Sequence, residues 1–138
     1  MMQKIEFPSS LAAEILNHAQ QDPRVEVCGL IGGGDSQALS CYPIDNIAED
    51  PVSVFFMDPQ QQIQAMRMMR ENDETLFGIY HSHPHSPAIP SPKDIEEASY
   101  PDAFYFVVSL NTKDVPEMNV FTIHDKQVTP VELIIVEA

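Results

Sequence analysis

The chain has 138 residues, which suits one domain, and 43% of them are hydrophobic, as in a globular protein with a single core. Seven basic residues against twenty-one acidic ones give a net charge of −14, which disfavours nucleic acid and anionic membranes as partners. No apolar run has signal-peptide or membrane-spanning length. We therefore expect one domain over residues 1–138, located in the cytoplasm.

The first half of the chain predicts two helices between short strands. Leu11, Ile15 and Leu16 repeat with a helical period that Asp22-Pro23 ends. Asp58 followed by Pro59 is typical of a helix start. The expected elements are a strand over 3–7, a helix from Ser9 or Ser10 to about Gln21, strands over 25–31 and 38–43, a loop over 43–51, a short strand over 52–57 and a helix from Asp58.

The second half predicts four strands and one short helix. The expected elements are a strand over 74–81, a proline-rich loop over 84–90, a helix over 91–98, and strands over 103–110, 115–123 and 127–136. The order lacks the regular strand–helix alternation of a doubly wound fold. We therefore predict an α+β fold, or a mixed three-layer sandwich, with six to eight strands and three helices.

Cys28 and Cys41 are the only cysteines. A two-residue hairpin at Gly34-Asp35 would place them opposite each other, as a non-hydrogen-bonded pair that could form a disulfide. A longer turn would break this register. Because cytoplasmic thiols stay reduced by default, the alternative is two free, half-buried cysteines.

The segment His81-Ser82-His83-Pro84 is the most informative motif. Residues two apart on a strand share one face, so both imidazoles can address one divalent metal ion. Asp94 opens the next predicted helix, after a loop long enough to fold its carboxylate back onto the histidines. Three protein ligands leave one position open for water, which is typical of catalytic zinc.

Each of these residues also has a local explanation that involves no metal. Ser91, Pro92 and Asp94 have the spacing of a helix capping box, with Asp in place of the usual Glu. A His-x-His pair can be two surface histidines. The combination of the pair, the following proline and a loop–helix aspartate nevertheless favours a metal site.

A zinc hydrolase also needs a base that takes a proton from the attacking water. Glu26 is the candidate, because its carboxylate interrupts the apolar segment 25–31. Strand alternation would equally permit an exposed Glu26 at a strand edge, and the local pattern does not choose between the two. The Ser91 hydroxyl could stabilise a developing oxyanion. His85 is expected to be exposed or behind the ligands, and His18 and His124 to be structural or surface residues.

Taken together, Glu26-Val27-Cys28-Gly29, His81-Ser82-His83-Pro84 and Ser91-x-x-Asp94 resemble the signature of the JAMM (MPN-plus, Mov34) zinc metalloprotease family. The resemblance implies an α/β/α fold similar to that of cytidine deaminases. It also implies one zinc ion held by His81, His83 and Asp94 with a water as fourth ligand, Glu26 as general base and acid, and Ser91 as a catalytic residue.

The same resemblance implies cleavage of a peptide or isopeptide bond after the Gly-Gly terminus of a ubiquitin-like or sulfur-carrier protein, as in small prokaryotic members. Two other functions stay open at this point. The chain could be a non-catalytic binding module with a structural or vestigial metal site. It could also hydrolyse a small amide, although the absence of a Cys-x-x-Cys pair counts against a nucleobase deaminase.

Overall fold

The computed structural model describes residues 2–137, which contain seven strands and three helices. These counts confirm the predicted mixed fold with six to eight strands and three helices. The elements are β1 (Lys4–Pro8), α1 (Ser9–Gln21), β2 (Cys28–Gly34), β3 (Gln37–Ile44), α2 (Pro59–Glu71), β4 (Thr75–His83), α3 (Pro92–Glu97), β5 (Phe104–Ser109), β6 (Glu117–His124) and β7 (Gln127–Val136).

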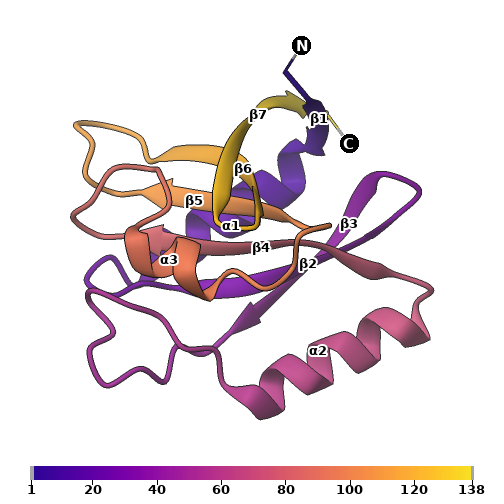
Figure 1. Cartoon of the computed structure of the whole chain (residues 1–138), viewed down its shortest axis with the longest axis horizontal. Helices are drawn as coiled ribbons and strands as arrows, with labels where there is room; N and C mark the ends of the chain where they lie inside the picture. The colour runs from indigo at the N-terminus through magenta and orange to yellow at the C-terminus, as the bar shows by residue number, and fades with distance from the viewer. Residues whose placement is uncertain (1, 138) are drawn as a thin grey trace.

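All seven strands form one sheet in the order β1-β7-β6-β5-β4-β2-β3 (Figure 1). Only β1 with β7 and β4 with β5 are parallel pairs. β4 and β5 are parallel, so their carboxyl ends lie side by side at one edge of the sheet. The loop and α3 that connect the two strands begin at this edge. Crevices at such strand ends are common ligand sites in sheets of this kind.

Helices α1 and α2 cover opposite faces of the sheet (Figure 1). Ile15 of α1 and Tyr80 of β4 belong to one buried cluster, and Met69 of α2 and Ile79 of β4 belong to the other. Side chains alternate along a strand, so beyond the register irregularity near Phe77 the odd-numbered residues of β4 face the α2 side. This alternation brings His81 and His83 to the same face as Ile79.

The predicted strand over 52–57 is wrong. The segment between β3 and α2 is a loop whose only ladder contact within the described residues is an isolated bridge between Asn46 and Met57. The side chain of Asn46 binds backbone groups of this loop, including the Val54 carbonyl and the Phe56 amide. Side-chain bonds of this type give a backbone an alternative to pairing in a sheet.

The register that would place the two cysteines opposite each other does not occur. The hairpin turns at Asp35 and Ser36, whose φ angles of 50° and 67° suit a two-residue turn, one residue later than expected. A bulge between Gly32 and Gly33 shifts the register further, so Cys28 pairs with Ile44. Both cysteines are free, as in the alternative reading. Burial raises the pKa of the Cys41 thiol to about 11, so this thiol stays protonated at neutral pH.

Among residues 2–137, no helix combines the length and apolar character that a bilayer crossing requires.

Candidate metal centre

The two predicted histidine ligands meet at the carboxyl end of β4. Both side chains are buried, and their Nε2 atoms lie 3.1 Å apart. The Nδ1 atom of His83 lies 2.8 Å from the carbonyl oxygen of Pro87, so Nδ1 carries the proton and donates it there. The bond turns Nε2 toward His81 and Asp94, and when Nε2 gives up its proton its lone pair is available to a metal, which is how a partner behind the ligand fixes the tautomer.

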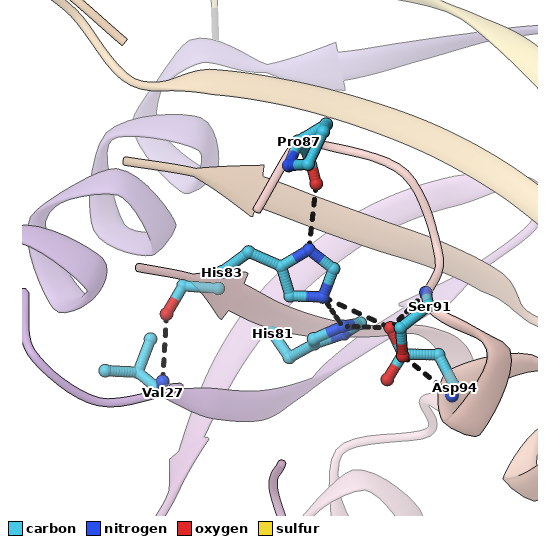
Figure 2. Close-up of polar contacts among 7 residues, drawn as sticks. Val27, His81, His83, Pro87, Ser91 and Asp94 are labelled. Atoms are coloured by element: carbon cyan, nitrogen blue, oxygen red, sulfur yellow. Dashed lines mark hydrogen bonds and ion pairs between the residues drawn. The ribbon is translucent and has the colours of Figure 1, made fainter. Parts of the chain in front are cut away.

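Asp94 completes the cluster from the first turn of α3. Its Oδ2 atom lies 2.9 Å from Nε2 of His81 and 3.2 Å from Nε2 of His83. Figure 2 shows the two rings and this carboxylate pointing toward one another. Despite burial, which alone would raise it, the hydrogen bonds to both histidines hold the pKa of Asp94 well below its usual range. The carboxylate is therefore ionised at neutral pH.

Asp94 is also part of the capping box that the sequence predicted. The Ser91 hydroxyl accepts a hydrogen bond from the Asp94 amide at 3.1 Å, and the Ser91 amide donates to Asp94 Oδ2 at 2.8 Å. These two bonds form a complete capping box. The capping box thus fixes the carboxylate that faces the histidines. The Ser91 Oγ accepts from the backbone, so its own proton remains available for another acceptor.

The spacing of these three atoms fits a zinc ion. A tetrahedral site with bonds near 2.0 Å has ligand-to-ligand separations of about 3.3 Å. The three measured separations of 2.9, 3.1 and 3.2 Å are close to that value. Two imidazole nitrogens and one carboxylate oxygen also form a donor set typical of catalytic zinc.

Glu26 lies just before β2 and is 4% exposed, so the reading of an exposed residue at a strand edge is wrong. Its Oε1 atom is buried and has no hydrogen-bond partner among the described residues. Burial raises the pKa of this carboxyl to about 7, opposed by His83 and assisted by Asp94 and Asp50. An unpaired buried carboxylate is costly and is a common feature of functional sites.

Glu26 also competes with Asp94 for the place of third ligand. One carboxylate oxygen of Glu26 and one nitrogen of each histidine lie within 4.8 Å of one another, so spacing alone admits Glu26 as a ligand. However, Asp94 Oδ2 lies at hydrogen-bond distance from both rings, whereas Glu26 Oε1 has no hydrogen-bond partner among the described residues. These contacts favour Asp94 over Glu26 as the third ligand.

Four residues that shape the site were missed by the sequence reasoning. Ser82 is fully buried; its Oγ accepts from the Val27 amide, and its own amide donates to the Val27 carbonyl, which ties β4 to the segment that carries Glu26. The ring of Phe55 stacks on His81 with centroids 4.6 Å apart. Pro87 orients His83, and Asn46 binds the Glu26 carbonyl. Only Ser82, buried between two ligands, had a local signal that could have revealed it.

The remaining histidines stand apart from the cluster. His85 and His124 are exposed, as expected. His18 lies on the opposite face of the sheet, where its Nδ1 atom is 2.7 Å from the hydroxyl of the buried Tyr80. His18 is therefore a structural residue.

A pocket of about 200 Å³ opens beside the cluster. His81 and Asp94 form one side of it, and three consecutive loop residues, Phe55, Phe56 and Met57, form another. Tyr100 and Tyr105 are also among its lining residues. The candidate metal centre therefore lies at the edge of a largely apolar pocket, as is usual for sites that bind organic ligands.

Comparison with known proteins agrees with this geometry. A family model described as prokaryotic homologs of the JAB domain matches residues 8–124. The chain belongs to this family. A desampylase of Haloferax volcanii is 36% identical over 111 residues, which cover 72% of this chain and 79% of that protein. A CysO-cysteine peptidase of Mycobacterium tuberculosis is 31% identical over 131 residues, which cover 94% of this chain and 89% of that protein.

Solved structures of other proteins share the fold. A protein of Desulfitobacterium hafniense superposes with a TM-score of 0.86 and 36% identity, over 97% of this chain and 94% of that one. A structure described as a JAMM metalloprotease-like zinc site in the proteasome and signalosome superposes with a TM-score of 0.59 over 99% of this chain and 100% of that one. The second match has 18% identity, so it is a likeness of fold alone.

Proposed function

We propose that this JAB-family protein is a zinc-dependent hydrolase of peptide or isopeptide bonds that follow the Gly-Gly terminus of a ubiquitin-like or sulfur-carrier protein. The observation that carries the proposal is the buried, unpartnered carboxylate of Glu26 beside two histidines and an aspartate. The names of the relatives, a desampylase and a CysO-cysteine peptidase, support the substrate class.

In this proposal His81, His83 and Asp94 hold the zinc ion. When bound, zinc would supply a Lewis acid that polarises the scissile carbonyl and lowers the pKa of water at its open position. The chain itself keeps these ligands in place. Pro87 fixes the ring of His83, the stacked ring of Phe55 fixes His81, and the capping box fixes Asp94.

Glu26 would act as general base and then as general acid. With its pKa raised to about 7, the carboxyl is divided between its ionised and protonated forms near neutral pH. A group with this pKa can accept a proton from the attacking water and return it to the leaving amine. Ser91 would donate its free hydroxyl proton to the oxygen of the tetrahedral intermediate.

The pocket beside His81 would take the extended tail of the carrier protein. Phe56 lines this pocket and is 57% exposed, so part of its apolar surface is free for a partner. The side chains of Tyr100 and Tyr105 would contact the same segment from another side of the pocket. A tail that ends in two glycines has no side chain next to the scissile bond, which allows its carbonyl to approach the buried ligands closely.

The proposal is tested by incubating the zinc-loaded protein with a ubiquitin-like carrier whose Gly-Gly terminus is joined to cysteine or to a lysine side chain. We expect release of the free carrier, loss of release with a chelator, and recovery when zinc is restored. Glu26→Gln should keep zinc and lose turnover. Full activity of Glu26→Gln would reject Glu26 as the base. No release from either adduct by the zinc-loaded protein would reject the substrate class.

A binding module with a vestigial metal site is the second candidate. Such a module has no need for an unpartnered carboxylate in a buried position, where it destabilises the fold. The geometry therefore favours the enzyme.

A further inference from the structure

The sheet holds Val27 through Ser82, but the amide and carbonyl of Glu26 itself bind a loop. β2 begins at Cys28, so Glu26 lies outside the strand ladder. Its amide donates to the Pro51 carbonyl at 2.7 Å, and its carbonyl accepts from Nδ2 of Asn46 at 2.8 Å. Both partners belong to the irregular segment between β3 and α2, which also supplies the wall of the pocket.

Asn46 is the centre of this loop. Its Nδ2 group donates to the carbonyls of Glu26 and Val54, the latter at 3.0 Å, with the Pro51 carbonyl a more distant third acceptor at 3.5 Å. Its Oδ1 atom accepts from the amides of Ala48 and Phe56 at 3.0 and 2.9 Å. One amide side chain thus uses both donors and both lone pairs on the backbone around it.

The two ends of this amide serve different parts of the site. The donor end reaches the segment of the base, Glu26. The acceptor end reaches Phe56, which lines the pocket, next to Phe55, which stacks on His81. Asn46 therefore links the backbone of the base directly to the loop that forms the pocket wall.

We propose that Asn46 is a positioning residue that sets the place of the Glu26 carboxylate relative to the metal ligands and the substrate pocket. The inference rests on the proposed hydrolase function. Its physical basis is that general acid–base catalysis needs placement to within about 0.5 Å, and that a misplacement of about 1 Å can cost on the order of 100-fold in rate. Glu26 has no ladder bonds of its own to supply such precision.

Asn46→Asp separates the two ends of the amide. The variant retains an oxygen that accepts from Ala48 and Phe56, but it replaces the donor with a second oxygen that faces the carbonyls of Glu26 and Val54. We expect kcat to fall by roughly 10- to 100-fold, because the base is displaced, with KM changed less than about twofold. Asn46→Ala removes both ends, so we expect it to lower kcat and also to raise KM.

Gln61, in the first turn of α2, offers a matched control because its side chain binds the same loop. Its side chain accepts from the Asp45 amide at 2.7 Å and donates to the Asp45 carboxylate at 2.8 Å, and it has no hydrogen bond to Glu26. Gln61→Ala should loosen the start of the loop and leave kcat within about twofold of the parent protein. If the loop only stabilises the fold, Gln61→Ala and Asn46→Asp will change kcat by the same factor. That result would reject the proposal.

A double-mutant cycle with Glu26→Gln tests whether Asn46 acts through the base. When two residues act through the same step, the second substitution causes little further loss of activity once the first has been made. In the Glu26→Gln background, Asn46→Asp should therefore reduce the residual rate by less than about twofold. If the rate of the double variant instead falls by the product of the two single-variant factors, the proposal is overturned.

A measurement without zinc or substrate keeps this test separate from the proposed function. In the metal-free protein, hydrogen exchange at the Glu26 amide should be faster in Asn46→Asp than in the parent protein or in Gln61→Ala, because its acceptor Pro51 belongs to the loop that Asn46 holds. Unchanged exchange at this amide would overturn the positioning role. If the zinc-loaded parent protein cleaves neither adduct, the proposed function fails, while the exchange result still decides the link between Asn46 and Glu26.

Discussion

Ser91 and Asp94 bind each other twice, and the same Oδ2 atom of Asp94 that accepts from the Ser91 amide contacts both His81 and His83. A helix cap and the candidate metal centre therefore share one carboxylate. Because the carboxylate is anchored by backbone geometry at its own helix start, its position depends little on the long loop that precedes it. The arrangement separates two roles of Ser91. Its amide holds the Asp94 carboxylate, and its hydroxyl proton remains available for the proposed oxyanion contact.

Ser91→Ala should affect catalysis much more than zinc binding. The variant keeps the amide that donates to Asp94 Oδ2 but loses the hydroxyl. Loss of an N-cap hydroxyl costs about 1 kcal/mol of unfolding free energy, and loss of an oxyanion donor costs roughly 100- to 1,000-fold in kcat. We expect near-parental zinc affinity by titration. Ser91→Thr, which keeps a hydroxyl, is the control, and an equally active Ser91→Ala would remove Ser91 from the mechanism.

Zinc should stabilise the parent protein and fail to stabilise variants that lack a ligand. A ligand at about 1,000 times its Kd adds about 4 kcal/mol to the unfolding free energy. Chemical unfolding with and without zinc should show this gain for the parent protein and its loss in His81→Ala, His83→Ala and Asp94→Ala. His85→Ala is the matched control, because His85 lies in the same segment but is exposed. Glu26→Gln should retain the gain; its loss there would instead make Glu26 a ligand.

The pH dependence of stability should report the buried carboxyl of Glu26 in the metal-free protein. Its pKa is raised to about 7 in the folded chain, so its contribution to stability is present below the unfolded pKa and is lost as pH rises through the folded pKa. Glu26→Gln lacks this loss. We expect the variant to gain roughly 2–3 kcal/mol over the parent between about pH 4 and pH 8. Chemical unfolding of both proteins in a chelator, at about pH 4 and at about pH 8, tests the sign of this difference. A larger advantage of Glu26→Gln at the acid end than at the alkaline end would contradict the prediction.

The part of the site that could be predicted from the sequence rests on local rules. His81 and His83 share a face because strand side chains alternate, and Ser91 and Asp94 meet because a capping box joins residues three positions apart. Glu26 could not be placed in this way, because its burial depends on a loop that has no periodicity. The cysteine register failed for a related reason: a turn displaced by one residue and a bulge at Gly32–Gly33 change every partner across the hairpin.

The contact between β2 and β4 that underlies the site requires a glycine at position 29. Gly29 pairs with Tyr80, and a Cβ atom at this position would overlap the Tyr80 ring. Tyr80 has no room to yield, because its side chain is fully buried and its hydroxyl is bonded to His18. Gly29→Ala should therefore lower the unfolding free energy by about 1–3 kcal/mol, as overpacking does in well-packed cores.

Gly34→Ala is the matched control for Gly29→Ala in the same strand. A Cβ atom at Gly34 would meet its nearest neighbour, the Asp73 carbonyl oxygen, at 3.8 Å, which is an ordinary contact, and Gly34 does not have a positive φ. We expect its unfolding free energy to stay within about 0.5 kcal/mol of the parent value. Because Cys28, next to Gly29, pairs with His81, separation of the strands at Gly29 would also displace a proposed metal ligand. Zinc affinity should therefore fall in Gly29→Ala and not in Gly34→Ala, and equal behaviour of the two variants would show that close packing at Gly29 does not support the site.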